Sequence, residues 1–164
     1  TGLYNQDSFY SIGGKIFQHA KEKNLRLAVV VMRIDYLRRY EEKYTHAVVD
    51  VLLEQMVEII DPLLAPTDLL ARFTNDNLVF ILEFSAESNS TALELCHRMK
   101  RKLQDQFFDF DGQRIQLTVS QGYTVYDGSE DCDLEKLVNV SQKALAKLQA
   151  EGNNGIEFIS HEEF

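Results

Sequence analysis

The sequence predicts an α+β protein of the ferredoxin-like, palm type, in which helices flank a central mixed sheet that is rich in antiparallel pairs. Two observations lead to this prediction. Apolar runs typical of strands alternate with segments of helical spacing, and two pairs of runs are joined by short polar turns. The resulting order is helix, strand, two helices, hairpin, helix, hairpin, helix and strand, which is typical of that architecture.

Apolar spacing and turn residues place each element along the chain. The prediction is a helix over residues 7–23, a strand over 25–34, helices over 36–43 and from 45 to 62, a hairpin over 69–82, a polar loop over 85–90, a helix over 92–103, a hairpin over 107–119, a helix from 133 to 152, and a strand over 156–159. The strand over 25–34 is the strongest, because six consecutive residues within it are apolar.

Capping residues and helix breakers set the helix boundaries. Asp7 or Ser8 can cap the first helix and Asp133 the last, because short polar side chains accept hydrogen bonds from the free amides at a helix start. Pro62 is expected to end the third helix, since proline has no amide hydrogen to donate. Gly152 follows the last helix in the position of a terminating glycine.

The two hairpins follow from apolar runs on either side of polar turns. Residues 69–73 and 78–82 flank the turn from Thr74 to Asn77, and the second run is apolar throughout, as in a central strand covered on both faces. A polar turn held on so buried a pair is a rigid platform for a site. Asp111-Gly112 is expected to form the second turn, and Gly122 to mark a β-bulge.

Composition and charge restrict the function classes. The 164 residues suffice for one domain with a substantial core, and 45% of them are hydrophobic. A net charge of −9 without a basic block argues against nucleic-acid binding and against an anionic membrane surface. No apolar run approaches the ~20 residues of a membrane span. Because the chain starts abruptly at Thr1-Gly2-Leu3, we expect a single domain, residues 1–164, excised from a longer protein.

Cysteine, histidine and tyrosine residues mostly favour structural roles. Cys96 lies on an apolar helical stripe, which indicates a packed thiol and a reducing, cytoplasmic compartment. The histidines have no partner at zinc-ligand spacing, so the sequence predicts no metal site. The residues Tyr36, Tyr40 and Tyr44 recur every four positions, which favours core or rim packing and leaves a partner surface as the alternative.

Six ordered fragments resemble the motifs of one known family. They are Thr1-Gly2-Leu3-Tyr4-Asn5 for TGLxNR, Arg33-Ile34-Asp35-Tyr36-Leu37 for DIDxFK, Tyr44-Thr45-His46 with Asp50 for YGHxxGD, Arg72-Phe73-Thr74-Asn75-Asp76-Asn77-Leu78 for RYGGDEF, Thr118-Val119-Ser120-Gln121-Gly122 for TxSxG, and Ala144-Leu145 with Gly152-Asn153-Asn154 for ALYxAKxxGRN. In this order and spacing the chain resembles a GGDEF domain, the diguanylate cyclase fold.

The resemblance implies a reaction that joins two GTP molecules into cyclic di-GMP between two facing domains. That chemistry needs Mg²⁺ held by carboxylates, because charge builds up on the attacking and leaving oxygens. It also needs a glycine turn, so that the backbone can approach the nucleotide without a Cβ in the way.

The chain departs from the family pattern where the resemblance places this chemistry. Arg33 replaces the first carboxylate of DID, a metal ligand in the family, and its charge would repel a cation by several kcal/mol. Thr74 and Asn75 replace the signature glycines, and Asn77 replaces the glutamate that follows the retained acid Asp76. Further departures are Glu41 for the guanine-reading asparagine, Gln149 and Asn153 for the phosphate-contacting Lys and Arg, and Ala65-Pro66-Thr67-Asp68 for the product-inhibition motif RxxD.

These losses affect metal, base and phosphate contacts together. They predict a degenerate, catalytically inactive GGDEF-like regulatory domain in a bacterial cyclic di-GMP signalling protein, with no cofactor and no catalytic residue. Its expected location is the cytoplasm, with the cytoplasmic part of a larger membrane-bound protein as the alternative. Its expected partners are neighbouring sensor or phosphodiesterase (EAL) domains of the same chain, or a protein partner, without nucleic-acid binding and without direct insertion into a membrane. We further expect Arg33 to pair with Asp76 in the place of the metal ion.

Two alternatives remain open at this point. The first is a sensor that binds GTP or cyclic di-GMP through the residual site residues Asp35, Asp50 and Asp76; the second is a working diguanylate cyclase. A structural explanation exists for two of these residues as well: Asp76 can cap its own turn, and Asp50 can be a solvated acid on a helix face.

Overall fold

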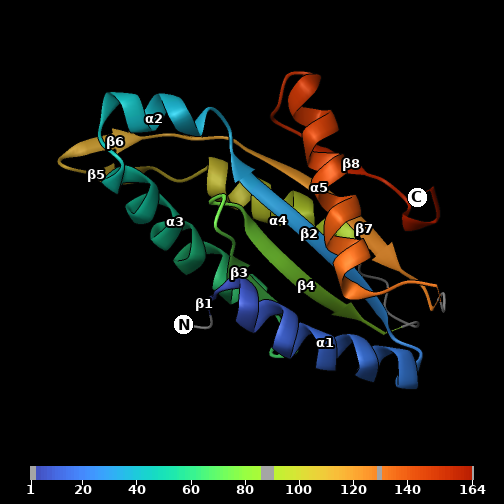
Figure 1. Ribbon diagram of the computed structural model, residues 1–164. Helices are drawn as coiled ribbons and strands as arrows, with labels where there is room; N and C mark the ends of the chain where they lie inside the picture. The colour runs from blue at the N-terminus through green and yellow to red at the C-terminus, as the bar shows by residue number, and fades with distance from the viewer. Residues whose placement is uncertain (1–2, 86–90, 129–130, 164) are drawn as a thin grey trace.

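The computed structural model describes residues 3–85, 91–128 and 131–163, and it forms a six-stranded mixed sheet with helices on both faces (Figure 1). The elements are β1 (Leu3–Tyr4), α1 (Gln6–Lys23), β2 (Arg26–Ile34), α2 (Leu37–Lys43), α3 (Ala47–Ile60), η1 (Asp61–Leu63), β3 (Leu69–Arg72), β4 (Leu78–Phe84), α4 (Ala92–Gln104), β5 (Phe108–Phe110), β6 (Gln113–Ile115), β7 (Val119–Tyr126), α5 (Leu134–Ala150), β8 (Ile156–Phe158) and η2 (His161–Glu163). The predicted α+β sandwich is confirmed.

Strand β2 lies at the centre of the sheet, whose order is β1-β3-β4-β2-β7-β8. It pairs antiparallel with β4 on one side and with β7 on the other, and only the short edge strands β1 and β8 are parallel to their neighbours. The predicted hairpin of β3 and β4 is confirmed. Its second strand is central and its first five residues are fully buried, as the uninterrupted apolar run indicated.

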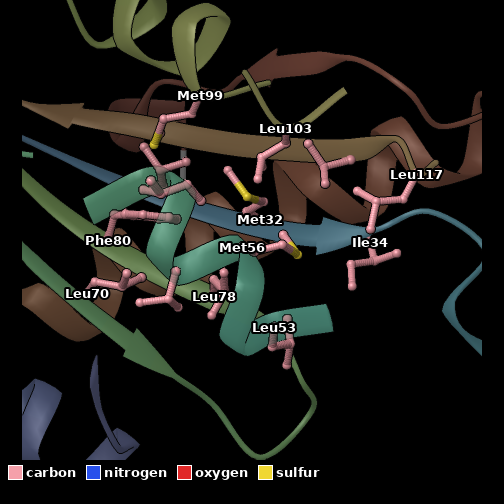
Figure 2. Close-up of a cluster of buried hydrophobic side chains, with 14 of the residues drawn as sticks. Met32, Ile34, Leu53, Met56, Leu70, Leu78, Phe80, Met99, Leu103 and Leu117 are labelled. Carbon is pink, nitrogen blue, oxygen red and sulfur yellow. The ribbon is translucent and has the colours of Figure 1, made fainter. Parts of the chain in front are cut away.

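Alternate side chains of β2 contribute to two separate cores. Ala28, Val30 and Met32 face α3 and α4, whereas the residues between them face α1 and α5. Figure 2 shows the first core, where Met32 and Met56 meet between β2 and α3. Both faces of the sheet are therefore covered, and the places left for a site are the strand ends and the turns.

Most helix boundaries agree with the prediction, but the first cap is different. Asn5 caps α1 by accepting a hydrogen bond from the Ser8 amide at 2.8 Å, so the expectation of Asp7 or Ser8 as cap is wrong. Asp133 caps α5 as predicted, and Gly152 follows its end with a φ of 120°. The first two residues of the opening motif and the predicted loop from 86 to 90 lie outside the described residues.

The second predicted hairpin needs correction. Its Asp111-Gly112 turn is confirmed, with positive φ at both residues, but the returning strand is β6, and β5 and β6 form a small sheet of their own. Strand β7 then runs separately through the central sheet. The apolar pattern does not predict β7, because the polar residues Gln121 and Thr124 interrupt it. Both side chains are nevertheless fully buried.

Gly122 does not mark a bulge, because the register of β7 with β2 is continuous from Leu27 to Ile34. The glycine serves close packing instead. A Cβ at this position would lie 2.3 Å from the amide nitrogen of Leu145 and 2.4 Å from the carbonyl oxygen of Ser141. The backbone of α5 thus contacts the backbone of β7 directly.

No helix among the described residues is both long and apolar enough to cross a bilayer. Cys96 and Cys132 are free and buried, in agreement with the packed thiol predicted for Cys96.

Burial of Cys96 predicts that stability falls at alkaline pH. Desolvation raises the pKa of this thiol from 9.0 to about 12. Above pH 9 the unfolded thiol ionises while the folded one keeps its proton, so the free energy of unfolding decreases by about 1.4 kcal/mol per pH unit. Urea titrations between pH 8 and 11 measure this slope. Cys96→Ala should have a shallower slope, and an equal slope in that variant would contradict the assignment.

Candidate functional site at the turn between β3 and β4

The turn that follows β3 is held tightly by its own backbone. The amide of Phe73 donates to the carbonyl of Asn77 at 2.9 Å, and the amide of Asp76 donates to the carbonyl of Phe73 at 3.0 Å. Asp76 has a φ of 65°, in the left-handed region that aspartate tolerates better than most residues. Beneath the turn, the Phe73 ring meets Phe9 of α1 edge to face. The turn is therefore the rigid platform that the sequence predicted.

Arg33, at the end of β2, fastens this turn to the sheet. Its Nη1 donates to the carbonyl oxygen of Asn75 at 2.6 Å and to Oδ1 of Asn77 at 3.0 Å. The neutral Asn77 thus accepts a hydrogen bond from the arginine in the place where the family pattern has a glutamate. The predicted pair of Arg33 with Asp76 is wrong, because the guanidinium binds the turn residues on either side of Asp76.

Asp76 instead pairs with Arg72, as does Asp50 from α3. The Nη2 of Arg72 lies 2.7 Å from Oδ1 of Asp76 and 2.8 Å from Oδ1 of Asp50. The tight turn returns Asp76 to the side of Arg72, four positions earlier in the hairpin. Burial opposes the charge on Arg72, but the hydrogen bonds to both carboxylates outweigh it and raise the pKa of the guanidinium. Two of the three predicted site residues are therefore joined by one cation.

Asp35 belongs to a different cluster and is only 3% exposed. Its carboxylate accepts hydrogen bonds of 2.6 Å from the hydroxyls of Thr118 and Ser120. Ser120 in turn accepts the amide of Asn154, which ties the segment after α5 to this cluster. The nearby Lys100 donates to the Val119 carbonyl, and burial lowers its pKa although Asp35 acts in the opposite direction. Asp35 thus fastens β2 to β7.

The residue at the position of the guanine-reading asparagine, Glu41, is also paired with a neighbouring side chain. Glu41 lies 2.7 Å from Nδ1 of the exposed His46. In the tyrosine series, Tyr40 donates to the Gln116 carbonyl at 3.4 Å and Tyr44 packs edge to face on Phe110, which supports rim packing for both. Tyr36 does not share their helical face, because it precedes α2 in a left-handed conformation and is half exposed.

Two cavities border β3, and the smaller one adjoins Asp50 and Arg72. A cavity of about 330 Å³ lies between α3 and β3 and is lined by Leu3, Asp50, Leu53, Glu54, Val57, Glu58 and Arg72. A larger cavity of about 730 Å³ between α1 and the segment before β3 was not predicted. Its lining includes Lys15, His19 and Asp68, of which only Asp68 belonged to a motif noted in the sequence.

Asp68 is the retained acid of the RxxD-like segment, and the structure gives it local hydrogen bonds. Its two carboxylate oxygens accept the amides of Ala65 at 2.8 Å and Glu83 at 3.0 Å. Burial raises the pKa of this carboxyl even though both hydrogen bonds act to lower it. The aspartate thus closes its own loop and joins it to β4, a role that does not require the missing arginine.

The donor set at the turn does not fit the Mg²⁺ ion that the resemblance implies. A magnesium site needs oxygen ligands arranged around an octahedron. Here the guanidinium of Arg33 is hydrogen-bonded into the turn, and the carboxylates of Asp50 and Asp76 both pair with Arg72. A divalent cation at this place would face two fixed positive charges.

Comparisons with known proteins agree with the fold and the motif order. The family described as diguanylate cyclase, GGDEF domain, matches residues 1–155. Diguanylate cyclase A of Treponema denticola is 27% identical over 134 residues, which are 82% of this chain and 34% of that protein. The cyclic di-GMP phosphodiesterase NbdA of Pseudomonas aeruginosa is 26% identical over 163 residues, which are 99% of this chain and 20% of that protein. The chain therefore spans about a third of the first relative and a fifth of the second.

Among solved structures, the diguanylate cyclase SiaD of P. aeruginosa, in complex with its activator SiaC, superposes with a TM-score of 0.84. The identity is 15%, and the match covers 97% of this chain and 60% of that one. At this identity the likeness shows a shared fold.

Proposed function

Since the chain belongs to the diguanylate cyclase GGDEF domain family of cyclic di-GMP signalling proteins, we propose that it is a non-enzymatic member. It would act by regulating a neighbouring domain or a protein partner. The observation that supports this most is the position of Arg33, which stands where the family pattern has a metal-binding carboxylate and is fixed there by two hydrogen bonds to the turn.

Displacement of Arg33 by a metal ion is energetically unfavourable. Withdrawing the guanidinium would break one hydrogen bond of 2.6 Å and another of 3.0 Å, and would leave the Asn75 carbonyl without this donor. Keeping it in place would cost a divalent ion several kcal/mol of repulsion at a distance of about 4 Å. Both routes oppose the gathering of triphosphates that the cyclase reaction requires.

The kinds of partner that we propose follow from the named activity of one relative and from the complex formed by another. NbdA is a cyclic di-GMP phosphodiesterase, and this chain spans 20% of it. This supports a neighbouring phosphodiesterase domain as one domain that the chain would regulate. SiaD is bound by an activator protein, which supports a separate protein partner as the other. In this proposal residues 1–164 are a single domain of a larger, multidomain protein, and the domain acts in the cytoplasm.

Magnesium sensitivity tests the role of Arg33. Millimolar MgCl₂ should leave the melting temperature of the wild-type chain unchanged, because the cation finds no ligand set at the turn. Arg33→Asp should be less stable without Mg²⁺, since the turn loses its fastening, and should regain several degrees when Mg²⁺ is added. A marked rise in the wild type would refute the proposal. Failure of the variant to respond would show that charge is not the obstacle.

A product assay tests the absence of enzymatic activity directly. Incubation with GTP and Mg²⁺, followed by chromatography and mass spectrometry, should yield no cyclic di-GMP. Asp76→Asn, purified in the same way, controls for a contaminating cyclase, because a contaminant would act equally in both preparations. Product that forms with the wild type and disappears with this variant would establish a working enzyme.

One observation favours a nucleotide sensor as the second candidate. The cavity of about 330 Å³ offers Asp50 and Arg72 side by side, a carboxylate and a cation suited to a purine edge and a phosphate. Glu54 and Glu58 also line it and oppose an anionic ligand. Calorimetry with GTP and with cyclic di-GMP separates the two candidates. Binding that Asp50→Asn abolishes would favour the sensor, and the absence of binding favours the purely regulatory domain.

A further inference from the structure

A histidine and two carboxylates meet at the end of the sheet farthest from the β3–β4 turn. Asp127 follows β7, whose last residue pairs with the start of β2, and His161 and Glu162 belong to η2. One ligand atom from each of the three side chains lies within 4.8 Å of the others. The two segments are far apart in the sequence, which explains why spacing along the chain gave no sign of them.

The burial of His161 points to a ligand at this cluster. The side chain is 3% exposed, and its Nε2 lies 3.6 Å from Oδ1 of Asp127, which is longer than a hydrogen bond. Among the described residues its ring makes no hydrogen bond, and it packs against the Tyr126 ring at 6.3 Å between centroids. The imidazole therefore faces a carboxylate at a distance too long for a direct hydrogen bond, and this distance suits two groups that share one ligand.

We propose that Asp127, His161 and Glu162 bind a divalent transition-metal ion, with Zn²⁺ as the best fit. An imidazole nitrogen with carboxylate oxygens suits zinc, whereas Mg²⁺ and Ca²⁺ favour oxygen ligands alone. Ligands about 2.1 Å from a tetrahedral zinc lie about 3.4 Å from one another, close to the observed separation of 3.6 Å between His161 and Asp127. Two carboxylates balance the charge of the ion.

The positions of the three residues define what the ion would do. His161 is held by burial, whereas Asp127 and Glu162 are exposed and free to adjust by the small amount that closing the site requires. Three protein ligands leave a fourth position for water. A bound ion would connect η2 to the end of β7, and this role is independent of the proposed regulatory function.

Thermal unfolding with and without ZnCl₂ tests the site. The melting temperature should rise by about 5 °C when free zinc is about 100 times its dissociation constant. Asp127→Asn and Glu162→Gln keep size and remove a charged ligand, so each should weaken zinc binding by at least about tenfold. Because these side chains are exposed, both variants should fold, whereas His161→Ala would also lose buried packing. Added Co²⁺ should give visible absorption bands in the wild type that both variants lose.

His46→Ala is the matched control, because it removes the histidine of the other histidine–carboxylate pair among the described residues. This control should retain the full zinc-induced rise and the cobalt spectrum. The proposal is overturned if zinc and cobalt have no effect on the wild type. It is equally overturned if Asp127→Asn and Glu162→Gln respond as the wild type does, since the metal would then bind elsewhere.

Discussion

Gly122→Ala is expected to lower the free energy of unfolding by more than about 3 kcal/mol. The added Cβ would lie 2.3 to 2.9 Å from three atoms, all of them in the backbone of α5. Backbone atoms in the middle of a packed helix cannot rotate away as a side chain can, so α5 must be displaced from the sheet. Urea denaturation followed by circular dichroism measures the loss, and a decrease in cooperativity would accompany it.

Gly14→Ala provides the control for this first prediction. Gly14 lies within α1, and a Cβ there would meet nothing within 4 Å. Alanine favours a helix interior by about 0.5–1 kcal/mol over glycine, so this variant should be as stable as the wild type or more so. Equal effects of the two substitutions would show that close packing at Gly122 is not what requires the glycine.

Asp35→Ala is expected to cost about 3 kcal/mol of unfolding free energy. The substitution leaves the hydroxyls of Thr118 and Ser120 without their shared acceptor in a site where Asp35 is 3% exposed. Chemical denaturation measures the effect. Asp76→Asn weakens a partly buried ion pair with Arg72 and keeps a residue type that tolerates the left-handed backbone, so it should cost less than about 1 kcal/mol.

The same pair of variants separates a structural from a ligand-binding role. If Asp35 belonged to a nucleotide site, its replacement would reduce the affinity for GTP or cyclic di-GMP with little change in stability. The buried hydrogen bonds of Asp35 predict the opposite result, because its carboxylate has no exposed surface of consequence to offer a nucleotide.

The elements that the sequence predicted well are those whose pattern is local. The apolar run of β2, the hairpin of β3 and β4, and the Asp111-Gly112 turn are each specified by residues within a few positions of one another. Strand β7 was missed because polar residues of the central sheet, Gln121 and Thr124, are buried by helices that a local pattern does not include.

The candidate site was predicted only in part, because ion pairs depend on backbone geometry. The sequence placed Arg33 and Asp76 near the same strand ends, which is correct. The left-handed backbone of Asp76 directs its carboxylate to Arg72. Arg33 instead binds the turn residues on either side of Asp76. The cluster of Asp127 with His161 was beyond sequence reasoning for a related reason, since strand register and the path after α5 bring it together.

The direct seam between α5 and β7 has a mechanical consequence. At Gly122 no layer of side chains separates the helix from the strand, so no side-chain rearrangement can compensate for a movement of the helix. We therefore expect a displacement imposed on α5 to reach the middle of the sheet undiminished, and amide protons of both elements to exchange in a single shared opening. Such stiffness suits a component that passes movement from one neighbour to another better than one that rearranges internally.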